Sequence, residues 1–271
     1  MNHFDAIYLS PHLDDAVYSC GARLFSQIKA GQRVLVITFF TATPPDENLT
    51  EFTRELKTRW GDISDINALR RSEDLAAARL LGFTSLHLPF SDCVYRQGGQ
   101  DNQALYPTVE HIFGEIHPAE AELPARLCSL FQESVADWPN STLFAPLAAG
   151  HHVDHLLVRL VAFALQRRGA TVCFYEDYPY SDKPAITQSA LAPFPAECRQ
   201  PETITFAEDA LEAKVRAAAC YKSQQSTFWY TLEEMTEAFR VQASAAAQLA
   251  HVQGYAENFW QIPSDCEEQS V

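Results

Sequence analysis

Two polar clusters contain the residue types that bind metals and move protons. The first is His-Leu-Asp-Asp at residues 12–15, and the second is His-His-Val-Asp-His at residues 151–155. Each cluster follows a short apolar run that is typical of a strand, and ligands of open α/β sheets bind at the carboxyl ends of strands. Imidazole nitrogens and carboxylates are ligand types of catalytic zinc sites, which hold three protein ligands and leave one position for water. Together the clusters predict a catalytic metal site.

Each cluster also has a simpler interpretation. A carboxylate after a strand often caps the next helix, so Asp14 or Asp15 alone is explained as an N-cap. Three histidines and an aspartate within five residues exceed what a cap requires. Other hydrolase and nucleotide sites are disfavoured, because the chain has no glycine-rich phosphate loop after its first strand, no GxSxG and no HExxH.

The segments that position these clusters alternate between strand and helix patterns over the first 180 residues. Strands are predicted at residues 6–10, 33–41, 85–89, 142–146 and 170–175. Helices are predicted at residues 14–29, 67–81, 120–136 and 156–168. This alternation predicts a Rossmann-like three-layer α/β sandwich with a mostly parallel sheet and right-handed crossovers. Residues 42–66 are predicted to be a loop or loose helix, and residues 91–118 a long loop near the site.

The pattern changes after residue 180. A strand is predicted at residues 203–206, followed by helices at residues 207–224 and 232–249. We expect a catalytic α/β domain, a helical extension packed on the same core, and a frayed acidic tail, at residues 1–200, 201–262 and 263–271.

The composition limits the classes of partner. Hydrophobic residues make up 47% of the chain and the formal charge is −15, which favours an ordinary globule and disfavours nucleic acid or anionic lipid as a partner. The first residues do not form a signal peptide, and no apolar run reaches the ~20 residues of a membrane span. Seven cysteines without a CxxC pair predict reduced thiols in the cytoplasm.

The paired clusters resemble the signatures of the PIG-L/LmbE-like family of zinc-dependent N-deacetylases. The family's first box is AHPDDE, and this chain reads SPHLDDA, with Leu13 in place of Pro and Ala16 in place of Glu. The second box is of HPDH type and reads HVDH here, with Val153 in place of Pro. The segment RRSEDLAAARLLG at residues 70–82 and the following LHLPFSD extend the resemblance, which covers residues 4–180.

The resemblance implies roles for the two boxes. His12, Asp15 and His155 would bind Zn²⁺, although Fe²⁺, Co²⁺, Ni²⁺ and Mn²⁺ suit the same ligands. Asp14 would be the general base for metal-bound water. His152, in a protonated form, would stabilise the developing oxyanion or act as an acid, and Asp154 would orient or charge it.

Five further positions are candidates for substrate binding because tyrosine rings stack on sugars and charged groups hold hydroxyls. The alternative is a turn with packed tyrosines, and a solvated helix face for the arginine. The candidates are Arg70, Asp92, Tyr175, Asp177 and Tyr178.

These features predict a hydrolase that removes an N-acyl group, with N-acetyl expected, from an amino-sugar-like small molecule. One alternative is a non-catalytic metal- or sugar-binding domain of the same fold, which Ala16 favours and Asp14 disfavours. A metal-dependent phosphoesterase would need more cationic groups and a second ligand cluster. Homo-oligomerisation stays open.

Overall fold

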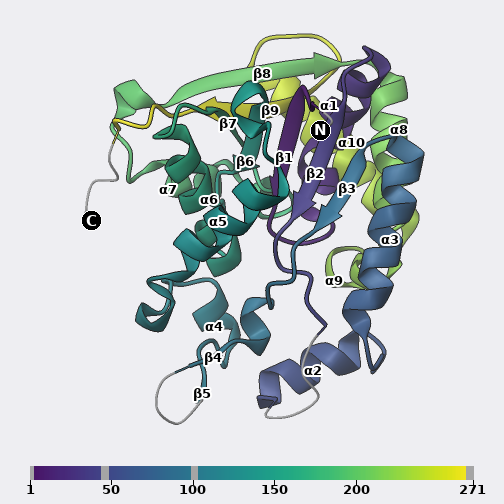
Figure 1. Cartoon of the computed structure of the whole chain (residues 1–271). Helices are drawn as coiled ribbons and strands as arrows, with labels where there is room; N and C mark the ends of the chain where they lie inside the picture. Colours follow the sequence, from purple (N-terminus) through teal and green to yellow (C-terminus); the bar gives the residue numbers. More distant parts are fainter. Residues whose placement is uncertain (1–2, 44–48, 99–102, 267–271) are drawn as a thin grey trace.

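Seven strands form one mixed sheet in the computed structural model, which describes residues 3–43, 49–98 and 103–266 (Figure 1). The strands are β1 (Ala6–Ser10), β2 (Val34–Thr38), β3 (Thr84–His87), β6 (Thr142–Pro146), β7 (Thr171–Tyr175), β8 (Gln200–Phe206) and β9 (Tyr255–Gln261). Their spatial order is β3-β2-β1-β6-β7-β9-β8. Pairs from β3 to β7 are parallel, whereas β9 is antiparallel to β7 and β8.

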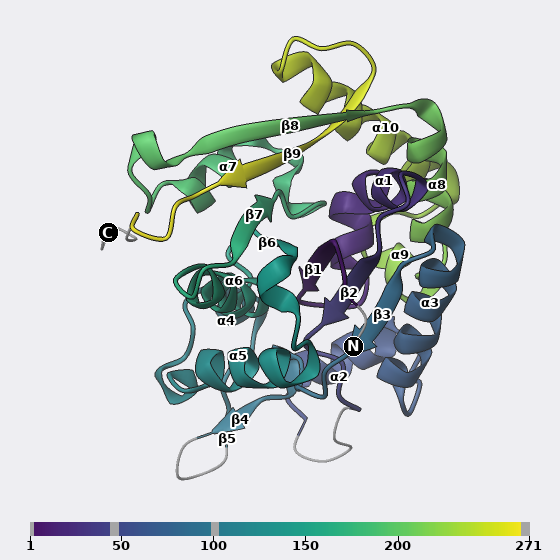
Figure 2. The same ribbon diagram turned by 45° about the horizontal axis from the view of Figure 1, so that its top comes forward.

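Helices cover both faces of this sheet, and Figure 2, with the top of the molecule turned forward, shows the strands between the two helical layers. One layer contains α5 (Leu123–Ser134), α6 (Val153–Gln166) and α7 (Pro184–Leu191). The other contains α1 (Asp15–Lys29), α3 (Ile66–Leu81), α8 (Glu208–Ala218) and α10 (Leu232–Leu249). The predicted Rossmann-like three-layer fold with a mostly parallel sheet is therefore confirmed.

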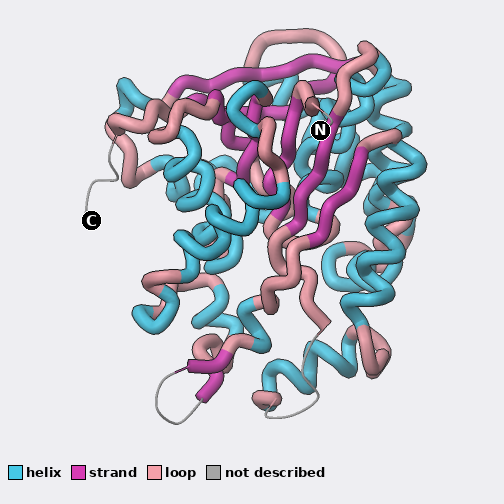
Figure 3. Tube along the Cα trace, in the orientation of Figure 1, coloured by secondary structure: helices cyan, strands magenta, loops and turns pink. Residues whose placement is uncertain are grey.

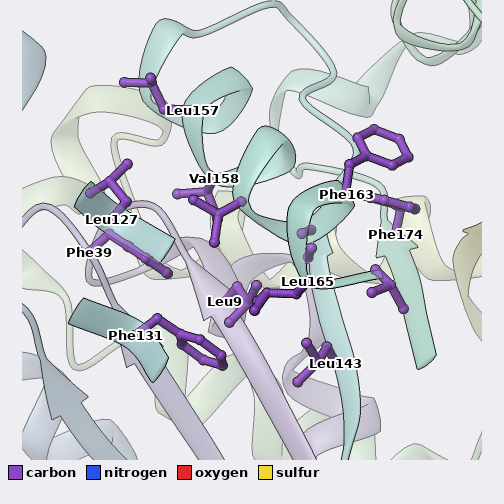
Figure 4. Packing of buried hydrophobic residues seen from close by; sticks show 14 of the residues in the cluster. Leu9, Phe39, Leu127, Phe131, Leu143, Leu157, Val158, Phe163, Leu165 and Phe174 are labelled. Atoms are coloured by element: carbon purple, nitrogen blue, oxygen red, sulfur yellow. The ribbon is translucent and has the colours of Figure 1, made fainter. Parts of the chain in front are cut away.

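Alternate side chains of the central strands enter two separate cores. Ile7 and Leu9 of β1 face the α5–α6 layer, whereas Ala6 and Tyr8 face the α1–α3 layer. All five residues of β1 are buried, as expected for a parallel strand with helices on both faces. Figure 4 shows the first core, in which sheet residues meet residues of α5 and α6, among them Leu9, Leu143, Phe174, Leu127, Phe131, Leu157 and Phe163.

Short elements lie beyond the carboxyl ends of the parallel strands. They are α2 (Glu51–Arg59), β4 (Gln97–Gly98), β5 (Gln103–Ala104), α4 (Val109–Ile112) and α9 (Lys222–Phe228). Figure 3 shows loops running from the strand ends into this region. Segment 42–66, predicted as a loop or loose helix, contains α2, and segment 91–118, predicted as a long loop, contains several short elements. Their residues 44–48 and 99–102 lie outside the described ranges.

Helix boundaries follow local capping signals. For α3, the Asp65 side chain accepts a hydrogen bond from the Ala68 N–H at 2.8 Å, and Gly82 ends the helix with φ of +94°. The predicted start of α6 at residue 156 is wrong, because His152 caps a helix that begins at Val153. The second polar cluster therefore forms the first turn of α6 instead of a preceding loop.

The C-terminal third completes the sheet and is more than a helical extension. Strand β9 was not predicted, because the buried Glu257 interrupts its apolar pattern. The Lys214 Nζ donates a hydrogen bond to the Glu257 Oε1 at 2.8 Å, which compensates this burial. The single helix predicted at residues 207–224 is two helices, α8 and α9.

The prediction that all seven cysteines are reduced is wrong, because Cys198 and Cys266 form a disulfide. Residue Gln200 of β8 pairs with Gln261 of β9, so the segments just outside these two strands lie together. The other five cysteines are free. The predicted acidic tail is described only as far as Cys266, and the prediction that it frays falls on residues outside the described ranges. Within those ranges, no helix has both the length and the apolar character needed to cross a bilayer.

Candidate active site

The two polar clusters meet at the carboxyl ends of β1 and β6, which are neighbours in the sheet. Strand β1 pairs with β2 on its other side, so the chain adds β2 and β3 to one side of β1 and adds β6 and β7 to the other. The strand order therefore reverses at β1, and ligands of open α/β sheets usually bind at such a switch point. The first cluster leads into α1, and the second caps and begins α6. The positive ends of both helix dipoles therefore lie at the site.

Three side chains place their ligand atoms together in a buried position. His12 Nδ1 is 3.1 Å from Asp15 Oδ2, and His155 Nε2 is 3.3 Å from the same oxygen. One ligand atom of each residue lies within 4.8 Å of the others. His155 Nε2 is fully buried and has no well-directed hydrogen bond among the described residues. Two imidazoles, one carboxylate and an unsatisfied nitrogen fit a divalent metal with three protein ligands.

Two further carboxylates contact the other ring nitrogen of each of these histidines. Asp177 Oδ1 lies 2.6 Å from His155 Nδ1, and Asp154 Oδ2 lies 3.0 Å from His12 Nε2. Metal-binding histidines usually bond a carboxylate through their other ring nitrogen, which fixes the tautomer and the ring orientation. The nitrogens that face Asp15 are thus the ones left for a metal.

The environments of Asp14 and Asp15 shift the pKa values of the two carboxyl groups in opposite directions. Burial disfavours charge on Asp15, but His155 and His12 overcome this and hold its pKa well below the usual range. Burial raises the pKa of Asp14, against the opposing effect of Arg70, whose Nη2 donates to Asp14 Oδ1 at 3.2 Å. Adjacent carboxylates whose pKa values are pushed apart typically divide into a ligand and a proton-transfer group. Asp15 suits the first role and Asp14 the second.

Arg96 is a site residue that the sequence did not reveal. Its guanidinium contacts Asp154 and Glu120, and lies over the rings of Phe40 and Tyr106 at 5.1 and 5.3 Å. Burial opposes ionisation of Asp154, but Arg96 and His12 keep the pKa of that carboxyl below the usual range. Arg96 therefore keeps Asp154 charged behind His12. It lies in the irregular segment 91–118, where no pattern marks such a partner.

His152 differs from the expectation that it is protonated. Burial lowers the pKa of His152 well below its ordinary value, which favours the neutral imidazole. His152 Nδ1 accepts the Asp154 N–H at 3.3 Å, which leaves the ring proton on Nε2. A neutral His152 remains a hydrogen-bond donor through Nε2. The Asp154 backbone N–H therefore orients the His152 ring, whereas the Asp154 carboxylate contacts His12 and Arg96.

Three of the five candidate substrate residues do not line the cavity beside His12. Tyr175 is 1% exposed and donates its hydroxyl to the Leu9 carbonyl at 3.0 Å. Tyr178 stacks on Trp229, with ring centroids 6.2 Å apart. Asp177 is fully buried, and its two carboxylate oxygens bond His155 Nδ1 and the Ala149 N–H. Their assignment to substrate is therefore corrected: the two tyrosines pack in the core, and Asp177 orients a histidine.

Arg70 and Asp92 do line the cavity beside His12, which measures about 190 Å³. Their roles toward a substrate stay predictions. Another wall of this cavity is apolar; the sequence places loop 91–118 near the site but did not identify the side chains of this wall. It is built by α2, α4 and α9 through Phe52, Leu56, Trp60, Ile112, Phe113 and Phe228. The spacing of residues 52, 56 and 60 is helical and was the available signal for α2.

Comparison with known proteins places this site in a family. A 2'-N-acetylparomamine deacetylase of Streptomyces fradiae is 30% identical over 178 residues, which is 65% of this chain and 57% of that protein. A protein of the same name from Niallia circulans is 28% identical over 193 residues, covering 64% of this chain and 66% of its own length. The match thus spans less than two thirds of either relative.

A solved structure extends the similarity over nearly the whole fold. A zinc-inhibited form of teicoplanin deacetylase superposes with a TM-score of 0.77 at 25% identity, covering 94% of this chain and 96% of that one. Residues 7–165 match the family PIG-L, described as GlcNAc-PI de-N-acetylase. That match covers more than half of the 271 residues and includes both polar clusters. The chain belongs to the PIG-L family.

Proposed function

We propose that this protein is a metal-dependent N-deacetylase that hydrolyses the acetamide of an amino-sugar-like small molecule. The observation that carries the proposal is the convergence of His12, Asp15 and His155 on one buried point with Asp14 beside it. The named activities of the relatives, which remove acetyl groups from paromamine or act in teicoplanin biosynthesis, support this class of substrate.

The residues divide the chemistry among themselves. His12, Asp15 and His155 would hold a divalent ion, which would supply the Lewis acidity that polarises the amide carbonyl and lowers the pKa of the attacking water. Asp14 accepts the proton of the attacking water and returns it to the departing amine. The neutral His152 donates from Nε2 to the carbonyl oxygen as negative charge develops there, and Arg70 holds the Asp14 carboxylate in place.

The metal we propose is Zn²⁺, because mixed imidazole and carboxylate ligation in a three-residue set suits it. The related teicoplanin deacetylase was solved in a zinc-inhibited form, so metal content and activity need separate measurement. We assign the reaction to the cytoplasm. The five free cysteines agree with that assignment, and the disulfide is the feature that opposes it.

Acetate release from 2'-N-acetylparomamine and from N-acetylglucosamine derivatives tests the proposal. We expect turnover by the wild type after loading with Zn²⁺, Fe²⁺, Co²⁺, Ni²⁺ or Mn²⁺, and its loss in Asp14→Asn and His155→Ala. Stoichiometric binding of these sugars without turnover under any of these metals would refute the proposal in favour of a binding domain.

A further inference from the structure

A second cavity of about 710 Å³ lies between α7, α10 and the edge formed by β8 and β9. It shares no lining residue with the catalytic cavity. The two are joined by one segment: Tyr178 and Ser181 line the second cavity, whereas Pro179 and Tyr180 line the catalytic one. Its volume falls in the usual range for small-molecule sites, roughly 300–1,000 Å³.

The charges along this cavity have one sign. Glu176 and Asp182 line it, and no described Lys, Arg or His does. Glu176 Oε1 accepts the Trp260 Nε1–H at 3.0 Å, and its second oxygen lies 3.5 Å from Asn258 Nδ2. Burial raises the pKa of this carboxyl. A cationic ligand would stabilise these carboxylates, and an anionic ligand would be repelled.

Two buried polar atoms in the lining residues are unsatisfied. Ser181 Oγ and Gln242 Oε1 have no hydrogen-bond partner among the described residues. A buried polar group without a partner destabilises the free protein, so a ligand that bonds these atoms gains affinity. These atoms suit hydroxyl or amine groups.

The opposite wall is apolar. Val241 and Leu249 of α10 line it and are 56% and 69% exposed, so a ligand can reach them. The Trp260 indole lies on the β9 side. An aromatic ring beside apolar side chains suits the C–H face of a sugar ring, and an indole also attracts cations.

We propose that this cavity binds a polyhydroxylated amine of the amino-sugar type. The ammonium group lies at Glu176 and Asp182, the hydroxyls bond Ser181 and Gln242, and the ring packs against Trp260. The chain's net charge of −15 raises the local concentration of such cations. A ligand of this kind would have the same chemistry as the amine product of the proposed reaction. Only the identification of the ligand as that product rests on the proposed function.

Calorimetric titration with paromamine tests the site. We expect wild type to bind it, and Glu176→Gln to weaken binding about tenfold or more, because the isosteric amide keeps an acceptor for Trp260 but loses the charge. Ala245→Trp fills the cavity from an exposed position of α10 and should abolish this binding event. Gln248→Trp, also exposed on α10 but outside the lining, is the matched control and should bind as wild type does.

The outcomes separate this site from the catalytic one. Equal affinity in Ala245→Trp and Gln248→Trp, or a binding event lost in Asp14→Asn but kept in Ala245→Trp, would overturn the proposal. Binding that depends on Glu176 in a protein that releases no acetate would support the second site while refuting the proposed reaction.

Discussion

Replacing Arg96 with methionine tests the buried ion pair behind the metal ligands. Arg96 contacts Asp154 and Glu120, which are 0% and 5% exposed. Methionine keeps much of the aliphatic volume between Phe40 and Tyr106 but removes the charge. Two carboxylates then stay buried without their cation, and breaking a buried pair in this way costs about 3–5 kcal/mol.

We expect Arg96→Met to lower the free energy of unfolding by about 3 kcal/mol. Since 1 kcal/mol shifts the midpoint of a chain of this size by about 2–4 °C, Tm should fall by about 6–12 °C in scanning calorimetry. Asp154 also holds His12 Nε2, so metal affinity should fall about 10–100-fold in a chelator competition assay.

Arg240→Met is the matched control. The Arg240–Glu208 pair is 39% and 49% exposed, so its loss should cost less than about 1 kcal/mol. The double variant Arg96→Met, Asp154→Asn should recover part of the lost stability, because the unpaired charge is also removed. Equal Tm values for the two arginine variants, with unchanged metal affinity, would refute the role assigned to Arg96.

Three other predictions concern Asp14, the Cys198–Cys266 disulfide and the buried carboxyl of Glu176. Asp14→Asn should reduce acetate release by about 10²–10⁴-fold while retaining the metal, measured by turnover and elemental analysis; a variant of full activity would remove Asp14 as the base. The Cys198–Cys266 bridge closes a loop of 68 residues, so reductant should destabilise wild type by about 4 kcal/mol at most and leave the melting of Cys266→Ser unchanged. Burial raises the pKa of Glu176, so the folded state keeps its proton to higher pH than the unfolded state does. The free energy of unfolding of wild type should therefore fall relative to that of Glu176→Gln as pH rises from the unfolded pKa of about 4.3 through the raised folded value. Urea denaturation at each pH measures this difference, and a difference that does not change with pH would contradict the prediction.

The features predicted correctly are those that neighbouring residues determine. Helix α3 ends at the left-handed Gly82, as the sequence predicts. Its buried face was not predicted, because Leu75 and Leu80 are 43% and 41% exposed whereas Arg70, Glu73 and Asp74 are buried. The two polar clusters were expected to meet because both follow strands, and parallel strands end at one edge of a sheet. The choice of His12 and His155 within them came from the family resemblance.

The features that were missed depend on which strands become neighbours. Asp177 follows the end of β7, and it reaches His155 because β7 lies beside β6 in the sheet, which the local sequence does not encode. Arg96 comes from an irregular segment and is placed by tertiary contacts. The Cys198–Cys266 bridge depends on the register of β8 and β9. The sequence did not predict β9, because the buried Glu257 interrupts its apolar pattern.

Metal content measured by elemental analysis tests the central claim most directly. Protein purified without added metal would be compared with His155→Ala, and with His151→Ala as a control from the same cluster whose side chain contacts Ser189 instead. We predict about one divalent ion per chain in wild type and in His151→Ala, and its loss in His155→Ala. Wild type that binds no divalent ion even after reconstitution, or a His155→Ala variant that retains one, would contradict the metal site built by His12, Asp15 and His155.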